Sequence, residues 1–501
     1  MTSNLLLTLI GLQICMAAFD TVYHHELTER LAWRPSQKHE LALHAARSLL
    51  YALLFTTLGL TEPHGLWAMV VIAVLATEVG ITLSDFVEED LSRKLPATER
   101  VLHTILAVNY GAILVLLVPI LVDWAWQPTA IVPINYGYVS LLAPLASLGA
   151  TTFGLREFFA ARRAARLSHG CADMLVDEIA ERRSFLITGA TGFIGTRLVE
   201  ALTAAGHDVT VLTHDPAKAA RLRPPFRLIT SLDDVPGDAR IDVIVNLAGE
   251  PIANGLWTRK KRERILQSRL KMTEGVVRLI RWLERPPSLL INASAIGIYG
   301  ACGDEKLDEN AQPRASFGRD VCAAWEAAAR EAENLGVRVV TLRIGLVLGI
   351  DGGMLGQMLP SYEFGLGARI GSGRQWMAWI ERDDLIRMIA RIVSDDAISG
   401  PVNGTAPEPV RNADFTRELA RTLRRPAVLA LPAWLLHNAA GDMADELLLT
   451  GRRVIPAKML SRGFKFQHET LRGALAKILT DQSAETPRRI PAGRAATSLP
   501  N

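Results

Sequence analysis

Five long apolar runs in the first 155 residues constrain the fold of this chain more than any other feature. They cover residues 3–19, 41–60, 66–83, 102–122 and 134–155. A helix needs about 20 apolar residues, within a range of about 17–25, to cross the hydrocarbon core of a bilayer. One such run could be a buried core helix, but five with few internal charges favour a membrane domain. We therefore expect residues 1–155 to form an α-helical membrane domain of about five spans, with the lipid bilayer as a partner.

Basic residues outside these runs predict the orientation of the membrane domain. They follow the first, third and fifth runs, at Arg30, Arg34, Lys38, Arg93, Lys94, Arg100, Arg156, Arg162, Arg163 and Arg166. The other two loops, residues 61–65 and 123–133, contain neither Lys nor Arg. Because basic loops stay on the cytoplasmic side, we expect an integral protein of a bacterial-type inner membrane. Its N-terminus would lie outside, and the part of the chain after the spans would lie in the cytoplasm.

The composition excludes some classes of function. The formal net charge of +3 is too small to indicate nucleic-acid binding. The four cysteines have no zinc-ligand spacing, so we expect reduced thiols. The N-terminus does not fit a signal peptide, because no basic region precedes Leu5.

The chain after the membrane domain divides into segments of different character. Residues 156–182 predict a basic helical connector, and residues 481–501, which contain several Pro and Arg residues, predict a disordered tail. From Ser184 on, short apolar strands alternate with amphipathic helices. This alternation predicts an α/β domain with a parallel sheet.

A glycine-rich loop opens the α/β part. The apolar segment 184–188 leads directly into Gly189-Ala190-Thr191-Gly192-Phe193-Ile194-Gly195, and a helix is expected from Thr196. Gly189 permits a tight turn, Gly192 lets the backbone approach a pyrophosphate, and Gly195 lets helix and strand pack closely. The N-terminus of the helix then favours phosphate through its free N–H groups and its dipole. With a second strand at 208–213, the pattern predicts a dinucleotide-binding Rossmann-like domain rather than a structural turn.

The end of the second strand bears on which dinucleotide binds. NAD-binding domains usually have an acidic residue about 20 residues beyond the loop, where it binds a ribose hydroxyl. This strand ends instead in Thr213 and His214, which we assign to the cofactor site. His214, Lys218 and Arg221 could surround a 2′-phosphate, which favours NADP, whereas Asp215 leaves NAD open as the alternative.

Later strands bring further residues to the same crevice, because ligands of open α/β sheets bind beyond the carboxyl ends of the strands. The strand at 241–247 leads into Leu247, Ala248 and Gly249. The small side chains at this point would let the chain pass close to a cofactor. Two further strands end at Ser294 and Arg343. We expect all these residues to contribute to cofactor binding.

These motifs resemble those of the extended short-chain dehydrogenase/reductase superfamily, and more closely those of its atypical NAD-dependent epimerase/dehydratase-like subfamily. The resemblance covers about residues 184–479 and rests on the glycine loop, 246–252, 268–269, 294–295, 299–300, 371–375, 379–380 and 383–384. Residues 451–464 resemble a small C-terminal module of those proteins. The resemblance implies a Rossmann-like NAD(P)-binding domain over 183–430 and a small C-terminal module over 431–480 that contributes a substrate lobe. Both are fused here to the membrane domain.

The sequence departs from the catalytic pattern of the superfamily. Active members use a Tyr-x-x-x-Lys pair, with tyrosine as general acid/base, but none of the seven tyrosines here precedes a lysine by four residues. Phe317 stands where the tyrosine would be expected, and a phenyl ring cannot transfer a proton. Ser294 and Tyr299 remain as catalytic candidates, although the motif around Tyr299 favours a structural role. The resemblance therefore implies cofactor binding more directly than it implies a reaction.

Six residues are candidates for the substrate side of the crevice: Glu250, Trp257, Arg269, Arg374, Trp376 and Trp379. The two arginines could clamp an anion, and the tryptophans could cover an apolar or planar small molecule. Each of the six could equally be part of an internal ion pair or an aromatic core.

Ionisable residues gather at the expected cytoplasmic ends of the first four apolar runs. They are Asp20, His24, His25, Glu26, Glu40, His44, Glu78, Asp85, Glu88, Glu89, Asp90, Glu99 and His103. Mixed histidines and carboxylates suit a metal centre, but no tight ligand spacing stands out. We favour a network of ion pairs with Arg30, Arg47, Arg93 and Arg100, and assign no metal ligand. Glu78 interrupts an apolar run and is the exception to watch.

The first functional hypothesis is a membrane-anchored NADP(H)-dependent oxidoreductase or epimerase-like enzyme that acts on a hydrophobic or membrane-delivered substrate. The second is a non-catalytic NADP(H)-binding redox sensor or membrane assembly factor, which the missing tyrosine–lysine pair favours. A third makes the membrane part a metal or transport module to which the α/β part supplies reductant. The substrate, the direction of reaction and the oligomeric state stay open at this point.

Overall fold

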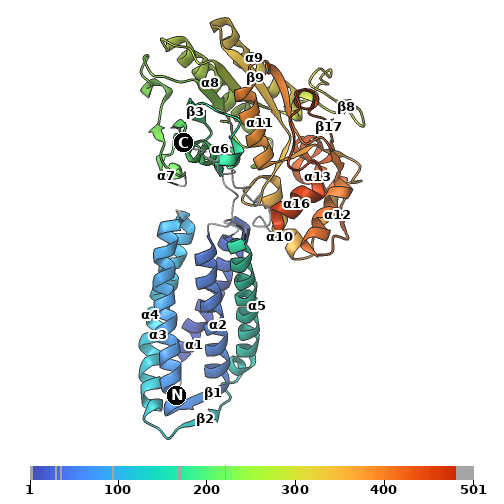
Figure 1. Cartoon of the computed structure of the whole chain (residues 1–501). Coiled ribbons are helices and arrows are strands. Elements are labelled where there is room, and N and C mark those ends of the chain that lie inside the picture. The colour runs from blue at the N-terminus through green and yellow to red at the C-terminus, as the bar shows by residue number, and fades with distance from the viewer. Residues whose placement is uncertain are drawn as a thin grey trace, which may run out of the picture.

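The computed structural model describes residues 4–28, 31–33, 37–92, 95–166, 172–220 and 222–480. A bundle of long helices is followed by an α/β domain that lies at one end of the bundle (Figure 1). Some residues used above lie outside the described residues: Arg30, Arg34, Arg93, Lys94, Cys171, Arg221 and the expected tail 481–501.

Five long helices form the bundle and run alternately toward and away from the α/β domain (Figure 1). They are α1 (Asn4–Asp20), α2 (Lys38–Leu60), α3 (Leu66–Ser92), α4 (Ala97–Ala125) and α5 (Tyr138–Arg166). At the end of the bundle far from the α/β domain, β1 (Thr61–His64) pairs antiparallel with β2 (Ala130–Pro133). At the other end, η1 (Thr21–Thr28) and η2 (Leu31–Trp33) follow α1. Each long helix covers all or most of one expected apolar run.

Apolar side chains fill the bundle and also cover its outside. Leu6, Leu54 and Leu121 are buried between the helices, whereas Val108 and Val115 are about three-quarters exposed, at 70% and 73%. Such an exterior is costly in water and suits a hydrocarbon surrounding. Four helical segments are long and apolar enough to cross a membrane, namely Leu5–Trp33, Lys38–Leu60, Leu66–Glu89 and Ala97–Ala125. The fifth span and the orientation in a membrane stay predictions.

The α/β domain is built on a parallel sheet of seven strands in the order β14-β9-β7-β6-β3-β4-β5. The strands are β3 (Ser184–Thr188), β4 (Asp208–Leu212), β5 (Arg227–Ile229), β6 (Val243–Asn246), β7 (Leu289–Ala295), β9 (Arg338–Ile344) and β14 (Gly400–Gly404). The chain runs from β3 outward to β5 and then returns to β6 on the other side of β3. The Rossmann-like α/β fold expected from the sequence is thus confirmed.

Helices cover both faces of this sheet because successive strand residues point to opposite faces. Phe185 and Ile187 pack toward α6 (Phe193–Ala204) and α11 (Arg382–Ser394). Leu186 and Ile244 pack toward α8 (Arg259–Trp282) and α9 (Phe317–Arg330). The topological switch between β3 and β6 therefore lies in the middle of a doubly covered sheet, where open α/β sheets bind ligands.

A smaller lobe extends the α/β domain. Its helices are α10 (Gly353–Glu363), α12 (Asn412–Leu423), α13 (Ala433–Ala440), α14 (Asp442–Ala444), α15 (Ala457–Ser461) and α16 (Leu471–Leu479). Its short strand pairs are β10 (Leu346–Leu348) with β13 (Trp379–Glu381), β11 (Ala368–Ile370) with β16 (Leu429–Leu431), β12 (Trp376–Met377) with β15 (Val410–Arg411), and β8 (Lys306–Leu307) with β17 (Arg453–Val454). One apolar cluster joins this lobe to the near end of the bundle through Trp33, Leu41 and Ala160.

Glu363, the last residue of α10, holds the two parts of the molecule together. Its carboxylate accepts hydrogen bonds from Arg163 at 2.8 Å, Arg156 at 3.1 Å and the Trp33 indole at 3.1 Å. Both arginines belong to α5, which continues to Arg166. The first part of the connector expected over 156–182 therefore belongs to α5. Arg156 and Arg163 of this part bind the carboxylate of Glu363.

Candidate functional site

The glycine loop lies at the carboxyl end of β3, next to the switch point. Gly189 has a φ of 68°, and a Cβ on it would lie 2.7 Å from the backbone of Leu247. A Cβ on Gly195 would lie 2.3 Å from the Gly189 carbonyl oxygen, so helix α6 starts directly against the turn. Gly192 is the N-cap of α6, and a Cβ there would meet only the Gly189 oxygen, at 3.1 Å. Two glycines are thus required by the fold, and Gly192 keeps the N-terminus of the helix open to a ligand.

Phe193 connects this loop to the smaller lobe. Its ring lies against a second glycine-rich turn, where a Cβ on Gly349 or Gly352 would come within 2.6 Å or 2.5 Å of the ring. The guanidinium of Arg382 lies over the Phe193 ring, 4.7 Å from the ring centroid, and forms an ion pair with Asp351 at 2.7 Å. Phe193 therefore packs the glycine loop against the turn that precedes α10, and its contact with a cofactor stays a prediction.

The turn after β4 exposes two basic side chains, His214 and Lys218. Thr213 is buried, and its hydroxyl oxygen accepts a hydrogen bond from the Asp215 backbone N–H at 3.2 Å, which closes a local turn. His214 is exposed beside this turn. The exposed Lys218 lies 3.8 Å from the Asp215 carboxylate. The turn therefore carries His214 and Lys218 outward, and Lys218 partly neutralises the acidic residue that left NAD open.

A buried chain of polar side chains crosses the carboxyl end of the sheet. Asn246 accepts a hydrogen bond from the Thr188 hydroxyl at 2.5 Å and donates to Thr273 at 3.0 Å and to Asn292 at 2.6 Å. The Thr188 oxygen also accepts from the backbone N–H of Ala248 at 3.3 Å. These bonds fix the path of Leu247 and Ala248 past Gly189, which is the wall of the expected crevice.

Ser294, Tyr299 and Arg343 come together around Glu326, a residue that the sequence did not single out. The Ser294 hydroxyl donates to Glu326 at 2.7 Å, and Arg343 binds both oxygens of the same carboxylate at 2.9 and 3.0 Å. Arg343 also donates to the Tyr299 hydroxyl oxygen at 3.1 Å, and that hydroxyl donates to Asn403 at 2.7 Å. Tyr299 is fully buried, and its burial raises the pKa of the phenol. Its bonds and burial support the structural interpretation of Tyr299.

Phe317, at the position of the missing tyrosine, begins helix α9. The carboxylate of Glu446 accepts hydrogen bonds from the backbone N–H groups of Phe317 and Gly318, both at 3.0 Å. The Phe317 ring packs edge to face on Trp257, with the ring centroids 4.9 Å apart. Met443 and Leu447 lie against the same apolar cluster. The C-terminal module thus closes over the position where the superfamily has its catalytic phenol.

Three of the six substrate-side candidates lie near this cluster and already have protein partners. The Trp257 indole donates to the Ile252 carbonyl at 2.9 Å. Glu250 pairs with Lys261 at 2.7 Å, and this hydrogen bond lowers the pKa of the carboxyl. Arg269 donates to the carbonyls of Glu250 and Ile265 at 3.0 and 2.9 Å, and burial lowers the pKa of its guanidinium. In this arrangement Arg269 shapes the loop after β6, as an internal residue would.

The other three candidates belong to the smaller lobe. Trp379 is fully buried in its core and donates to the Glu408 carbonyl at 2.9 Å. Trp376 donates to Asp304 at 2.8 Å, with the Arg411 guanidinium 4.1 Å from its ring centroid. Arg374 is exposed. The exposed Arg374 and the half-buried Trp376 are therefore better placed to meet a small molecule than Trp379 is.

The comparisons with known proteins agree with this geometry. The sequence profile of the NAD dependent epimerase/dehydratase family matches residues 185–403, and a domain of unknown function, DUF1731, matches residues 431–478. An epimerase family protein of Mycobacterium bovis is 39% identical over 295 residues, which cover 59% of this chain and 97% of the relative. The chain belongs to the NAD dependent epimerase/dehydratase family. The epimerase family protein YfhF of Bacillus subtilis is 37% identical over 299 residues, 59% of this chain and 98% of YfhF.

A solved structure of the same family carries a nucleotide. The human epimerase family protein SDR39U1, whose crystal structure contains NADPH, is 32% identical and superposes with a TM-score of 0.54, over 59% of this chain and 99% of the human chain. The family relationship confirms the Rossmann-like domain and its C-terminal module, and it supports the prediction of a nucleotide cofactor. Residues before 185 lie outside both family matches, so the helical bundle is an addition to the matched part.

The sequence analysis named none of three residues of this site as a single candidate: Glu326, Asn246 and Glu446. The parallel register sets Asn292 beside Asn246 and Ser294 beside Arg343. Glu326 of α9 then binds both Ser294 and Arg343. Glu446 reaches α9 from more than a hundred residues away in the chain. The sequence does offer one sign of Glu326. It is a carboxylate one turn after Cys322 on the buried face of a predicted amphipathic helix.

Proposed function

We propose that this protein is a membrane-anchored NADP(H)-dependent oxidoreductase or epimerase-like enzyme, and that its substrate is a hydrophobic small molecule delivered from the bilayer. The observation that carries the proposal is the glycine cradle at the switch point of the parallel sheet, where Gly192 caps an open helix N-terminus. The family relationship does not favour the alternative of a non-catalytic sensor or assembly factor.

The residues present fit a dinucleotide. Gly192 is the N-cap of α6, and a Cβ there would meet only the Gly189 oxygen, so this position leaves room for phosphate oxygens beside the first backbone N–H groups of the helix. Gly189, Leu247 and Ala248 would form one wall of the cofactor site. When bound, NADP(H) supplies or accepts a hydride, and the protein supplies position and electrostatics.

NADP is proposed over NAD because of the end of β4. Thr213 has no carboxylate for a ribose 2′-hydroxyl, and its own hydroxyl oxygen accepts a hydrogen bond from the Asp215 backbone. His214 and Lys218 are exposed beside it and can meet a 2′-phosphate. The NADPH in the human relative supports this choice.

For the chemistry, we propose that Ser294 hydrogen-bonds the reacting oxygen of the substrate. Its hydroxyl now donates to Glu326, which Arg343 holds from the other side. Glu326 is then a positioning residue: its carboxylate accepts the Ser294 hydrogen bond and holds the hydroxyl in place until the hydroxyl turns to donate its one proton to the substrate oxygen. Arg374 and Trp376 are proposed for substrate recognition, and Phe317 with Trp257 for an apolar cover over the reacting group.

Membrane anchoring is proposed from the apolar exterior of the bundle and the alternation of its helices. The N-terminus would lie outside and the α/β domain in the cytoplasm, as the basic loops indicate. Glu363 then fixes the α/β domain close to the membrane surface, where a hydrophobic substrate is concentrated.

The test is NADPH turnover by the full-length protein in detergent, followed by nicotinamide absorbance in the presence of a membrane lipid extract. We expect oxidation that depends on the extract and falls at least about 10²-fold in Ser294→Ala. The matched control is Ser288→Ala. Ser288 directly precedes β7, the strand that contains Ser294, and its hydroxyl donates to the Asp242 carbonyl. NADPH that binds but never turns over with any lipid fraction would refute the enzymatic proposal and restore the sensor hypothesis.

A further inference from the structure

The end of the helical bundle next to the α/β domain contains a buried cluster of histidines and carboxylates. Its members come from all five long helices and from η1: Asp20, His24, His25, Glu40, His44, Asp85, Glu89, Glu99, His103 and Glu157. Glu40 and Glu99 are fully buried, and His25 and His44 are 4% and 2% exposed. Side chains of this kind are expensive within an apolar bundle unless they have a function.

Two histidines at the centre of this cluster lack hydrogen bonds. Both ring nitrogens of His25 and both of His44 are buried, and none has a hydrogen-bond partner among the described residues. The two rings stack with their centroids 4.6 Å apart. Buried polar atoms are almost always hydrogen-bonded, and an exception calls for an explanation such as a bound ion. Carboxylate oxygens lie 3.0 Å from His44 Nε2 and 3.4 Å from His25 Nε2 without forming an aligned hydrogen bond, an arrangement that suits ligands around a shared ion.

Carboxylate oxygens surround these nitrogens at the spacing of metal ligands. His25 Nε2 lies 3.4 Å from Asp20 and 3.8 Å from Glu99, and His103 Nε2 lies 3.0 Å from the same Asp20 oxygen. Ligand atoms bound to one ion at about 2.0–2.2 Å lie about 2.9–3.6 Å apart in octahedral or tetrahedral geometry. One atom each from Asp20, His25, Glu99 and His103 lies within 4.8 Å of the other three.

A second set of ligand atoms includes His44, the other of the two stacked rings. Glu40, His44 and Glu89 also offer one atom each within 4.8 Å of one another. Asp85 lies 3.0 Å from His44 Nε2. The two sets repeat one motif, since Glu40 precedes His44 by four residues on α2 as Glu99 precedes His103 on α4. This spacing puts both side chains of each pair on one helix face.

We propose that the bundle binds two transition-metal ions of the carboxylate–histidine class, iron or manganese. The first ion is held by Asp20, His25, Glu99 and His103, and the second by Glu40, His44 and Glu89. The ligands contain no thiolate, and mixed carboxylate and imidazole ligands in a helical bundle are typical of paired iron or manganese ions. The proposal rests on the bundle alone and is independent of nucleotide binding.

Ion pairs account for only part of this cluster. Arg47 pairs with Asp85 at 2.9 Å, and Arg156 donates to Glu26 at the edge of the cluster. His24 and His103 have carboxylate partners, since His24 Nδ1 lies 2.7 Å from Asp20 and His103 Nδ1 lies 3.2 Å from Glu89. Contacts of this kind orient ligands in metal sites. The network favoured by the sequence pattern therefore exists in part, but it leaves His25 and His44 without hydrogen bonds.

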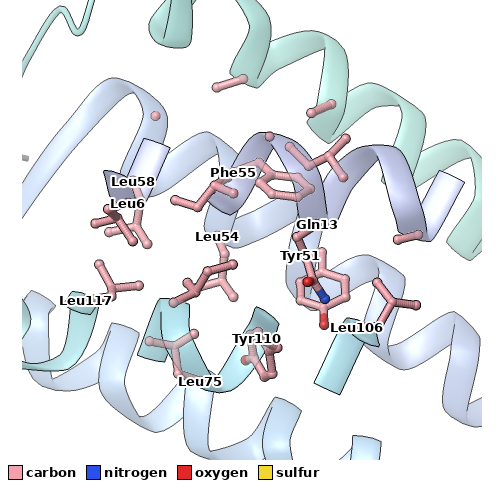
Figure 2. A pocket seen from close by; sticks show the side chains of 18 of the residues that line it. Leu6, Gln13, Tyr51, Leu54, Phe55, Leu58, Leu75, Leu106, Tyr110 and Leu117 are labelled. Atoms are coloured by element: carbon pink, nitrogen blue, oxygen red, sulfur yellow. The ribbon is translucent and has the colours of Figure 1, made fainter. Parts of the chain in front are cut away.

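An apolar cavity of about 330 Å³ leads from the cluster into the bundle. Asp20, His103 and Arg47 line one end of it, and Leu6, Leu54 and Leu117 line its length. Figure 2 shows Leu6, Leu58 and Leu117 together on one side of the pocket and the polar ends of Tyr51 and Gln13 on the other. The first ion would thus lie at the head of a cavity that fits an apolar molecule from the bilayer.

The test is metal content and metal binding of the full-length protein purified in detergent without chelators. Elemental analysis is followed by titration of the chelator-treated protein with Mn²⁺ alone, with free Mn²⁺ measured by its electron paramagnetic resonance signal. We expect two ions per chain. His25→Gln and His44→Gln should each lose about one of them, and the double variant should lose both.

The matched control is His64→Gln at the far end of the bundle, where His64 lies 3.7 Å from Glu62. It should bind as many ions as the unsubstituted protein. Circular dichroism and size-exclusion elution of every variant identify those that fail to fold, and Glu99→Gln then replaces a variant lost in this way. The proposal is overturned if the unsubstituted protein binds neither Mn²⁺ nor Fe²⁺, or if the folded double variant binds as many ions as the control. One ion per chain would remove the second site.

Discussion

The carboxylate of Glu363 accepts a hydrogen bond from Arg163 at 2.8 Å and thereby joins the last residue of α10 to α5. The same α10 begins at Gly353, in the glycine-rich turn that packs on Phe193 of the nucleotide loop. One helix therefore spans the distance between the bundle and the proposed cofactor. Glu26, which also binds Arg156, directly follows His25 of the proposed metal site.

Glu363→Ala should destabilise the contact between the two parts of the molecule. It leaves Arg156 and Arg163, 21% and 25% exposed, without the carboxylate between them. Breaking a buried pair costs about 3–5 kcal/mol, and the partial exposure reduces the expected loss to about 2 kcal/mol. Thermal unfolding in detergent measures the change. The control is Glu305→Ala, an exposed partner of Arg314, and equal effects of both substitutions would argue against a joining role for Glu363.

Gly192→Val should abolish nucleotide binding and leave the fold intact. A Cβ at this position meets only one backbone oxygen, at 3.1 Å, so its main effect is to fill the space proposed for phosphate. Gly237→Ala, where a Cβ makes only ordinary contacts at 3.5 Å, is the control. Calorimetric titration with NADPH compares the two. Unchanged affinity in folded Gly192→Val would mean that the phosphates do not lie there.

Lys218→Ala should weaken NADPH binding by about tenfold, which corresponds to about 1.4 kcal/mol, and leave NADH binding nearly unchanged. The reason is that Lys218 lies beside the turn at Thr213, where only NADPH carries a phosphate. Lys260→Ala, an exposed lysine at the start of α8, should change neither. A parallel loss for both nucleotides would assign Lys218 to a general electrostatic role.

Lys477→Met should destabilise the α/β domain, and more at high pH than at low pH. Lys477 lies 3.4 Å from Glu381 and 3.2 Å from Asp383. Burial and the neighbouring Asp383 raise the pKa of Glu381 above its ordinary 4.5, so Glu381 stabilises the fold at low pH and loses that contribution as the pH rises through the raised pKa. Despite its burial, Asp383 has a lowered pKa because of Lys477 and Arg197, so its contribution is lost only on acidification below about 3.8.

Without Lys477 the pKa of Glu381 rises further, because the attraction that opposed burial is gone. The unfolding free energy should therefore fall by about 2 kcal/mol near pH 8 and by less near pH 5. Denaturant titrations at both pH values measure the difference. Lys306→Met, an exposed lysine, serves as the control, and a loss that is larger at the lower pH would reverse the assignment of Glu381.

The topology can be tested with single cysteines in intact cells. Gln127→Cys lies in the turn at the far end of the bundle and should react with a membrane-impermeant maleimide. Lys260→Cys in the α/β domain should react only after lysis. The unsubstituted protein, with its own four cysteines, gives the background. Labelling of Lys260→Cys in intact cells would reverse the predicted orientation.

The sequence predicted those features that depend on local pattern. Apolar runs of bilayer length gave the five helices, and the spacing of Gly189, Gly192 and Gly195 located the turn between β3 and α6. These succeed because a positive φ at Gly189 and a missing Cβ at Gly195 are demands of a few neighbouring residues.

Features that depend on long-range packing could not be predicted from the sequence. The sequence presents Arg269 and Trp379 as substrate-side candidates but does not reveal that Arg269 donates to backbone carbonyls and that Trp379 is fully buried. Their contact with a substrate stays a prediction. The pairing of Glu446 with the start of α9 and the stacking of His25 on His44 need the assembled fold. Residues on different helices that meet only in the folded protein have no fixed spacing in the sequence. For this reason the histidine cluster was interpreted as a set of charges at helix ends.

Equilibrium binding of NADPH and NADH to the full-length protein in detergent tests the central claim most directly. The account predicts saturable binding of one nucleotide per chain, with NADPH at least about tenfold tighter than NADH, and loss of both in Gly192→Val. Binding of neither nucleotide by a folded protein would contradict it.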